Sequence, residues 1–476
     1  MQNSAPALVS IFAVSLLCAA TLGCAGHDRI TGRTIVRAGI AEIDITPPVG
    51  YRMAGYFDER LSTGVHDPLK AKAIVLHQGS EKIALVFCDL VGVSLNASKM
   101  ARQRASEKTG IPVKNILIAA THSHTGPLFD DPRATYFHQT ALEKLGTDPQ
   151  QKIDYPKYLE DQLVNVICRA HSNLKPARLE AGIAQQEGLA FNRRYHMKNG
   201  KVAFNPGQLN PNIDRPAGPT DPAVGMLLVR DSKQNLRGGL TVFGMHSDTV
   251  GGTLYSADYA FYLQETLRKE FGEKFVSAFA AGTCGDLNHI NVAVKTPVKG
   301  QDVAERLGNT LGRTVLANIQ HAEPLKNPSF AVRSETIVAP LQEITAAQLA
   351  DAREKISRLN DASAGFFMKV EAVKTLDLAK KGTSWPMEVQ VFRLDSETAM
   401  VGLPCEIFVE LGLAIKAQSP FKKTMVMSMC NDRPSYVPTK KAFAEGSYEV
   451  TNARVKPGVG EALVETAVKL LNEVKP

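Results

Sequence analysis

Apolar and polar positions along the chain predict strands and helices that follow one another in turn. Runs rich in β-branched and aliphatic residues predict strands at 71–79, 82–93, 115–120, 238–246, 274–290 and 424–429, after an alternating strand that ends at Pro47-Pro48. Helical composition marks 96–110, 256–272, 344–361 and 460–474, and 398–415 passes from strand to helix at Pro404. This alternation predicts an α/β fold of mixed β-sheet layers covered by helices.

The sequence contains no internal repeat and no low-complexity linker. We interpret 344–361 as an exposed helix and 128–155 as a polar insertion, neither of which requires a domain boundary. With 476 residues, of which 44% are hydrophobic, the chain is long enough to bury a sizeable core. We therefore expect residues 36–476 to form one large domain.

Charge and cysteine content narrow the possible functions. The net charge of +7 is spread along the chain without any long block of Lys and Arg, which argues against nucleic-acid binding. This mildly basic balance equally suits binding to anionic lipids or polysaccharides. Apart from Cys18 and Cys24, the cysteines are five, widely spaced and without a C-x-x-C motif. This pattern predicts neither a disulfide framework nor a zinc ribbon, so a metal would be held mainly by His, carboxylate or Tyr.

The N-terminus has the pattern of an export signal. Residues 7–23 carry no charge and are at the short limit for spanning a bilayer, with small residues near the end of the run. We expect a signal peptide at 1–26 and a periplasmic or extracellular protein. The sequence "TLGC" at 21–24 is similar to the lipobox of bacterial lipoproteins, in which Cys24 would be lipidated, so a membrane-tethered form and a freely exported form both remain open.

Two histidines follow the strand "NILIAA" in the stretch 115–127, "NILIAATHSHTGP". If the extended conformation continues through them, His122 and His124 point to the same face and reach one site. Such a pair suits a metal or proton transfer, whereas the alternative is a polar loop after a buried strand.

Further polar residues follow other predicted strands: His246, Asp286, Glu406 and Tyr436. Strand ends give several chain segments a shared rigid rim, and two imidazoles with a carboxylate are a common ligand set for catalytic zinc. Each residue also has a structural alternative. His246 is equally a hydrogen-bonded core residue, and Glu406 is equally a complement to a helix dipole.

Six segments in the same order resemble the neutral ceramidase family. They are "AATHSHTGP", "FGMHSDTV" with "LYSADYAFYL", "AAGTCGDLNHIN", "GLPCEIF", "SYVPTKKAFAEGSYE" and the opening "AGIAEIDITPPVG" with "GVHDPLKAKAIVL". The resemblance covers roughly residues 38–450. It implies a single catalytic domain of the neutral-ceramidase type and zinc-dependent hydrolysis of an N-acyl amide.

The resemblance also implies roles for individual residues. One Zn²⁺ would be bound by four residues: His122, His246, Glu406 and Tyr436. His124 would lie beside the zinc-bound water that attacks the substrate, Arg193 or the adjacent Arg194 would orient the scissile group, and Tyr448 would stabilise the oxyanion. Arg193 is preferred because "FNRRY" matches the family at the Asn-Arg pair.

Two departures from the family pattern concern the substrate. Asn288 stands where the family has a serine implicated in catalysis, and asparagine cannot be a nucleophile. We also expect the chain, whose sequence ends at Pro476, to lack the immunoglobulin-like domain that family members generally carry. The predicted function is an exported zinc hydrolase acting on ceramide or a related lipid amide, with possible peripheral membrane association. The alternatives are a non-catalytic, metal-binding envelope lipoprotein and a metallohydrolase with another amide or ester substrate.

Overall fold

The computed structural model describes residues 35–433 and 435–476. Within these ranges, residues 35–476 group into one compact unit. The predicted signal peptide at 1–26, with Cys24, lies outside the described residues. No helix in the described part of the chain is both long and apolar enough to cross a membrane.

A sheet of nine strands forms the larger of two main sheets in the described residues. Its spatial order is β14 (Val276–Ala281), β12 (Leu236–Phe243), β11 (Ala223–Asp231), β6 (Lys175–Gln185), β1 (Arg37–Asp44), β3 (Lys70–Gln78), β4 (Glu81–Cys88) and β5 (Ile116–Ala120), and β16 (Glu323–Pro324) pairs with β6. The pairs β12–β14 and β4–β5 are parallel, and the other pairs are antiparallel. The sheet is therefore mixed, as the sequence predicted.

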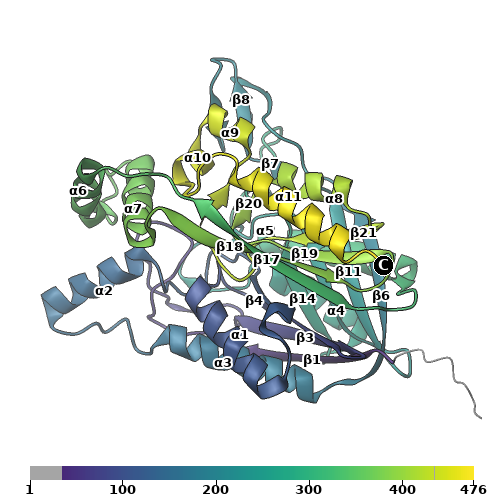
Figure 1. Cartoon of the computed structure of the whole chain (residues 1–476). Coiled ribbons are helices and arrows are strands. Elements are labelled where there is room, and N and C mark those ends of the chain that lie inside the picture. The colour runs from purple at the N-terminus through teal and green to yellow at the C-terminus, as the bar shows by residue number, and fades with distance from the viewer. Residues whose placement is uncertain (1–34, 434) are drawn as a thin grey trace, which may run out of the picture. The chain divides into compact units, whose positions relative to one another are not determined.

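A four-stranded sheet packs on one face of the larger sheet (Figure 1). Its order is β17 (Ala331–Pro340), β18 (Ser384–Arg393), β19 (Thr398–Gly402) and β21 (Lys423–Met427), with β19–β21 parallel. Helices cover the outer faces of both sheets. The larger sheet carries α1 (Leu95–Thr109), α3 (Tyr155–Ser172), α4 (Tyr259–Phe271) and α5 (Gln301–Asn318), and the smaller carries α8 (Val409–Gln418) and α11 (Val459–Glu473).

Alternating side chains on the strands connect these layers. On β3, Ile74 and Leu76 join the core between the two sheets, whereas Ala73 and Val75 join the core under the helices. All four are completely buried. Successive residues of a strand point to opposite faces, so a strand buried on both sides reads as one continuous apolar run.

The remaining elements lie at the edges of the layers. The other helices are α2 (Pro132–Leu145), α6 (Ala346–Lys355), α7 (Phe366–Lys381), α9 (Lys440–Glu445) and α10 (Tyr448–Asn452). The short strand pairs are β2 (Gly64–Val65) with β13 (Leu254–Tyr255), β7 (Phe191–Asn192) with β15 (Leu287–Asn288), and β20 (Glu406–Ile407) with β22 (Tyr436–Val437). A three-stranded sheet contains β8 (Arg194–Met197), β9 (Val202–Phe204) and β10 (Ile213–Pro216).

Three local predictions differ from the structure. The helix expected from Ser256 begins at Tyr259, because Asp258 caps it and the Ser256 hydroxyl donates instead to Asp67. The helix expected to begin at Pro404 begins at Val409, because β20 lies between β19 and that helix. The polar insertion 128–155 contains α2, because Asp131 caps its first turn and Pro132 begins it.

Candidate metal and active site

The predicted site residues gather where parallel strands end. His122 follows β5, His246 follows β12, and Glu406 and Tyr436 follow β19 and β21. Glu406 and Tyr436 are directly paired across the parallel strands β20 and β22. The convergence therefore arises from strand ends in both sheets.

His122 reaches the site through a turn and not through an extended strand. β5 ends at Ala120, and His122 has a φ of 68°, in the left-handed region that non-glycine residues rarely adopt. The expectation that His122 and His124 share one face of a continuing strand is therefore wrong. Their side chains still meet, with His122 Nε2 and His124 Nε2 3.4 Å apart.

Both His122 and His246 are held by backbone carbonyls behind their rings. Nδ1 of His122 donates to the carbonyl of Val91, and Nδ1 of His246 donates to the carbonyl of Cys284, each at 2.8 Å. These bonds leave Nε2 of each ring free to face the other side chains of the site. A second ring nitrogen bonded in this way is the usual support of a metal-ligating histidine.

Glu406 lies between these two rings. Its Oε2 is 3.1 Å from His246 Nε2 and 3.3 Å from His122 Nε2. His246 Nε2 and Glu406 Oε2 are nonetheless buried without a hydrogen-bond partner in the described structure. Leaving such atoms unpaired is costly, and a cation between them would satisfy both. The residues present therefore fit a metal ion.

His124 provides a third imidazole. Ligand nitrogens of His122, His124 and His246 lie within 4.8 Å of one another, so a three-histidine set is also geometrically open. His124 Nδ1 is buried and has no hydrogen-bond partner among the described residues. The distances alone leave two arrangements, in which His124 either binds the metal or stands beside it.

Burial and the neighbouring charges set the protonation of the site. Burial, followed by the charge of Arg193, lowers the pKa of His246 to about 4, and burial keeps the pKa of His124 well below its ordinary value. Burial opposes the ionisation of Glu406, but His122 and His246 outweigh it and hold its pKa well below the usual range. His246 and His124 are therefore neutral at pH 7 and offer lone pairs, beside an ionised carboxylate.

Two phenols line the same site. The Tyr436 ring stacks on His246, with centroids 6.4 Å apart and planes 12° apart, and Tyr448 meets Tyr436 edge-on at 5.5 Å. Burial, followed by the charge of Glu406, raises the pKa of both tyrosines. Both hydroxyls therefore remain protonated at neutral pH in the absence of a bound cation, and both can donate hydrogen bonds.

The two adjacent arginines point in different directions. Arg193 lies over the rings of Tyr436 and Tyr448, at 5.4 and 5.8 Å, and donates to Glu449 and to the carbonyl of Gly285. Arg194 donates to the carbonyl of Gly446 and to Glu449, away from the phenols. The structure brings Arg193, the preferred candidate, into the site. Glu449 is completely buried and fixes both guanidinium groups.

Asn288 lies on the short strand β15, and its side chain has two hydrogen-bond partners. Its Nδ2 donates to Asn205 Oδ1 at 2.9 Å, and its Oδ1 accepts from the backbone of Ile290 at 3.0 Å. Nearby Asp286 accepts from Val409 N and from Asn192 Nδ2, both at 2.8 Å. Asp286 therefore ties this segment to the start of α8 and to β7.

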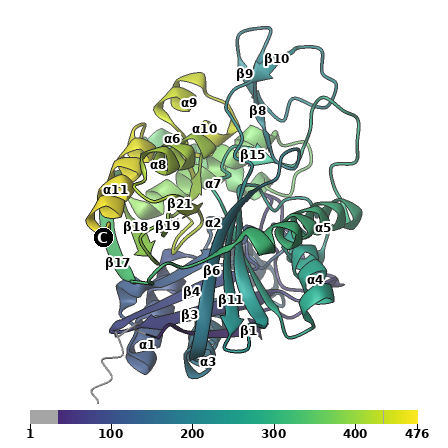
Figure 2. The same cartoon turned by 90° about the vertical axis from the view of Figure 1, so that its right-hand side faces the viewer.

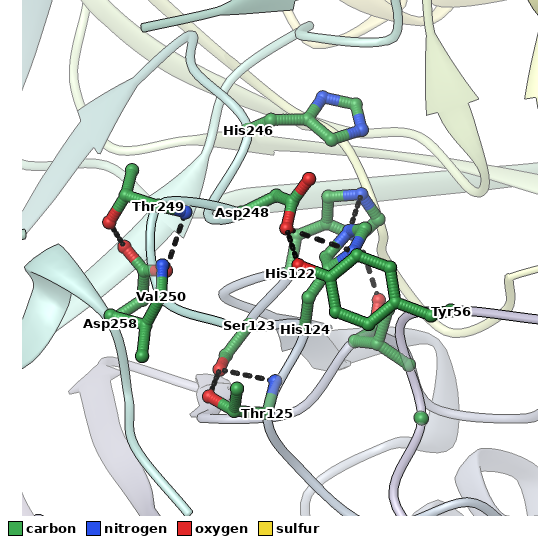
Figure 3. A network of polar contacts seen from close by, with 12 residues as sticks. Tyr56, His122, Ser123, His124, Thr125, His246, Asp248, Thr249, Val250 and Asp258 are labelled. Carbon is green, nitrogen blue, oxygen red and sulfur yellow. Dashed lines mark hydrogen bonds and ion pairs between the residues drawn. The ribbon is translucent and has the colours of Figure 1, made fainter. Parts of the chain in front are cut away.

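The sequence prediction missed a polar network on the outer side of His124 (Figure 3). Asp248 Oδ1 lies 3.7 Å from His124 Nδ1 and accepts a 2.6 Å hydrogen bond from the Tyr56 hydroxyl. Lys299 contacts Asp248 and lies 2.8 Å from the Tyr56 hydroxyl. The signal for Asp248 was its place two residues after His246, whereas nothing local marked Tyr56 or Lys299.

Asp258 anchors the loop that carries His246 and Asp248 (Figure 3). The buried carboxylate of Asp258 accepts from the backbone of Thr249 and Val250, at 2.8 and 2.9 Å. The same carboxylate caps α4 through the backbone N–H of Tyr259. The N-terminus of a helix and the loop of the site are therefore fixed by one side chain.

Known proteins resemble the chain in both sequence and structure. A neutral ceramidase of Pseudomonas aeruginosa is 26% identical over 264 residues, which are 53% of this chain and 37% of that protein. Neutral ceramidase A of Dictyostelium discoideum is 23% identical over 306 residues, which are 59% of this chain and 40% of that protein. The chain thus matches less than half the length of these relatives.

Solved structures agree with the fold described above. The crystal structure of the neutral ceramidase from Pseudomonas aeruginosa matches with a TM-score of 0.70 and 20% identity, covering 93% of this chain and 75% of that one. A ceramidase complexed with C2 matches with a TM-score of 0.69, 20% identity, and coverage of 92% and 75%. At this identity the likeness concerns the fold.

The family model for the N-terminal part of neutral/alkaline non-lysosomal ceramidases matches residues 36–375. This range includes both strand-end histidine segments and all nine strands of the larger sheet. It covers well over half of the sequence. The chain belongs to the neutral/alkaline non-lysosomal ceramidase family.

Proposed function

We propose that this protein is an exported, zinc-dependent hydrolase that cleaves the amide bond of ceramide, or of a closely related N-acyl amide, into a fatty acid and an amine. The single observation that carries the proposal is the unpaired, buried Glu406 Oε2 facing His246 Nε2 at 3.1 Å. Family membership supports hydrolysis of an amide, since relatives of similar sequence are named neutral ceramidases.

The donor set favours zinc over a hard cation. Neutral imidazoles suit zinc, whereas magnesium and calcium prefer oxygen donors. His122, His246 and Glu406 would hold the ion, and Tyr436, paired to Glu406 across β20 and β22, would complete the set. A bound zinc ion would polarise the substrate carbonyl and lower the pKa of water to about 7 in a well-tuned site.

His124 is the residue we propose for moving the proton. Its Nε2 lies 3.4 Å from His122 Nε2, and burial keeps the ring neutral, so it can accept a proton from an attacking water. Asp248 at 3.7 Å from Nδ1 would stabilise the positive charge that the ring then gains. The ring can afterwards return the proton to the leaving amine.

Arg193 and Tyr448 supply donors for the oxygen that becomes negative when the amide carbonyl is attacked. Arg193 is fixed in place by Glu449 at 2.8 Å, and Tyr448 stands beside Tyr436. Fixed donors of this kind need no reorganisation during the reaction. In comparable sites each lowers the activation free energy by about 3 kcal/mol.

The reaction we propose passes through no acyl-enzyme at Asn288. An amide side chain has no nucleophilic oxygen for such a step, and here it is engaged with Asn205 and Ile290. Asn288 would instead shape the loop beside the substrate. Replacing it with serine tests this assignment: the rate of amide cleavage should not depend on gaining the hydroxyl.

Export, lipidation at Cys24 and peripheral membrane association remain parts of this proposal that rest on sequence alone. They are compatible with a lipid amide as substrate. Radiolabelled palmitate incorporation in a bacterial host, compared between the full chain and its Cys24→Ala variant, tests the lipoprotein assignment. Fractionation of the same cells tests export.

The decisive assay is hydrolysis of a panel of ceramides and simpler N-acyl amides by purified protein, before and after chelation and zinc readdition. The proposal expects cleavage that chelation abolishes and zinc restores. Ester cleavage without amide cleavage would move the function to another hydrolase reaction. Stoichiometric metal without any turnover would favour the non-catalytic envelope lipoprotein.

A further inference from the structure

A continuous series of aromatic rings leads from the buried site to the protein surface. We call it the aromatic strip, and it consists of Tyr436, Tyr448, Phe204, Phe366, Phe367 and Phe57. Inside, Tyr436 stacks on His246. The series then passes to Tyr448 and to Phe366, with successive ring centroids 5.5 and 5.2 Å apart.

The outer end of the aromatic strip is exposed. Phe366 and Phe367 begin α7, have 45% and 48% of their surface exposed, and lie 5.6 Å apart, ring to ring. Tyr436 and Tyr448, by contrast, are only 4% and 8% exposed. The strip therefore runs from the buried site to solvent, and the guanidinium of Arg193 packs on its inner rings, those of Tyr436, Tyr448 and Phe204.

Distant parts of the chain build the strip together. Phe57 packs edge-on against Phe366 at 5.7 Å, and Phe204 packs on Tyr448 at 4.6 Å. Figures 1 and 2 both show α7 beside α10, which carries Tyr448. Four segments far apart in the sequence thus contribute rings to one connected series.

The two half-exposed aromatic rings leave apolar surface in contact with water, which is unfavourable in free energy. A bound apolar group would cover that surface. The inner end of the strip contacts the proposed metal ligands. The substrate must reach these ligands, so the substrate is the occupant that fits the strip. The surroundings are charged, with Lys369 paired to Asp58 and Arg133 over Phe57. A lone aromatic pair among such charges is a poor membrane anchor but a good wall for an extended apolar chain.

We infer that the aromatic strip binds the hydrocarbon chain of the amide substrate and makes Phe366 and Phe367 determinants of chain-length specificity. This inference rests on the proposed amide-hydrolase function. The scissile amide lies at the inner end near Tyr448, and the chain extends outward along Phe366 toward Phe367. Substrates too short to pass Tyr448 gain nothing from the outer rings.

The test compares wild type with Phe366→Ala, Phe367→Ala and the double variant on N-acyl amides that share one amine. Acetyl, hexanoyl and dodecanoyl substrates are used in detergent-free buffer below their aggregation concentrations. For wild type, kcat/KM should rise with length, by up to about fourfold for each methylene group that becomes buried. The variants should flatten this rise through KM, because they lose more kcat/KM on the dodecanoyl substrate than on the acetyl substrate.

Three controls keep the outcomes separable. Met100→Ala on α1, at a side chain 41% exposed, removes a similar apolar group away from the strip and should change nothing. Phe366→Leu keeps apolar bulk in case the alanine variants fold poorly, and should retain part of the length dependence. Equal slopes for wild type and the double variant would overturn the inference.

Two further results have distinct meanings. A loss confined to substrate embedded in phosphatidylcholine vesicles, with unchanged slopes for soluble amides, would overturn the inference in favour of membrane docking. If wild type cleaves no amide, the proposed hydrolysis fails, and calorimetric binding of dodecanoate still tests the strip. Binding that weakens at least about tenfold in the double variant supports it, and unchanged binding overturns it.

Discussion

Glu406 Oε2 lies 3.1 Å from His246 Nε2, and both atoms are buried without a hydrogen-bond partner among the described residues. The two rings of His122 and His246 are held from behind by carbonyls at 2.8 Å. A carboxylate oxygen arranged in this way between the ring nitrogens of two histidines fits a metal ion.

Arg193 and Arg194 provide a matched pair of substitutions. Arg193→Lys removes the planar group fixed between Glu449 and the phenols, so we expect kcat/KM for amide hydrolysis to fall roughly 100- to 1000-fold. Arg194→Lys loses contacts to Gly446 and Glu449 away from the phenols, so it should lower the unfolding free energy by about 1–3 kcal/mol instead. Equal losses of activity per folded molecule would contradict this assignment.

Asp248 is expected to act through His124. Asp248→Asn keeps the size of the side chain but removes the charge 3.7 Å from His124 Nδ1, and kcat should fall roughly tenfold, less than for His124→Ala, which we expect to cost about 100-fold or more. Tyr56→Phe removes the hydrogen bond to Asp248 and should act in the same direction. Because both belong to one network, the double variant should be little worse than Asp248→Asn. Fully multiplicative losses in kcat would show that the two act separately.

Gly285 supports the site by its lack of a side chain. A Cβ at this position would stand 2.5 Å from the carbonyl oxygen of Glu406, so Gly285→Ala must displace the backbone that carries the carboxylate. We expect zinc affinity to fall at least about tenfold, although no donor is removed. Gly365→Ala, where a Cβ meets nothing within 4 Å, is the control for the same change. Zinc titration with a competing chelator measures both, and equal affinities would refute the prediction.

Asp286 predicts a pH dependence of stability. Burial raises its pKa from 3.8 to about 6, so between these values the native state holds a proton that the unfolded chain releases. Its stabilising contribution is therefore complete below about pH 4 and is lost as the pH rises through 6, a change of about 3 kcal/mol. Urea unfolding across this range should show that Asp286→Asn removes that part of the slope.

The sequence was sufficient to predict the layered α/β fold, and the structure brings together the residues after strands that the sequence singled out. Strands buried on both faces, such as β4 and β5, are continuous apolar runs, and the polar residues after strands mark the rim where His122, His246, Glu406 and Tyr436 meet. The six family segments added the pairing of these distant residues. The neutral ceramidase fold expected from them agrees with the structural match.

Other features depended on contacts that no local pattern encodes. His122 adopts a left-handed conformation because of the surrounding structure, so the strand period failed there. Tyr56 and Lys299 join Asp248 from segments 192 and 51 residues away. The aromatic strip likewise assembles from separate segments. Such backbone conformations and long-range contacts depend on tertiary packing, so they can be recognised only in the folded structure.

Zinc content tests the central claim most directly. Protein purified without added metal should carry about one zinc per chain by mass spectrometry, and Glu406→Gln and His246→Ala should lose it while keeping the wild-type circular dichroism spectrum. His124→Ala should keep its zinc if this residue stands beside the ion. Wild-type protein without stoichiometric zinc after zinc reconstitution, or full zinc occupancy in the Glu406 and His246 variants, would contradict the account.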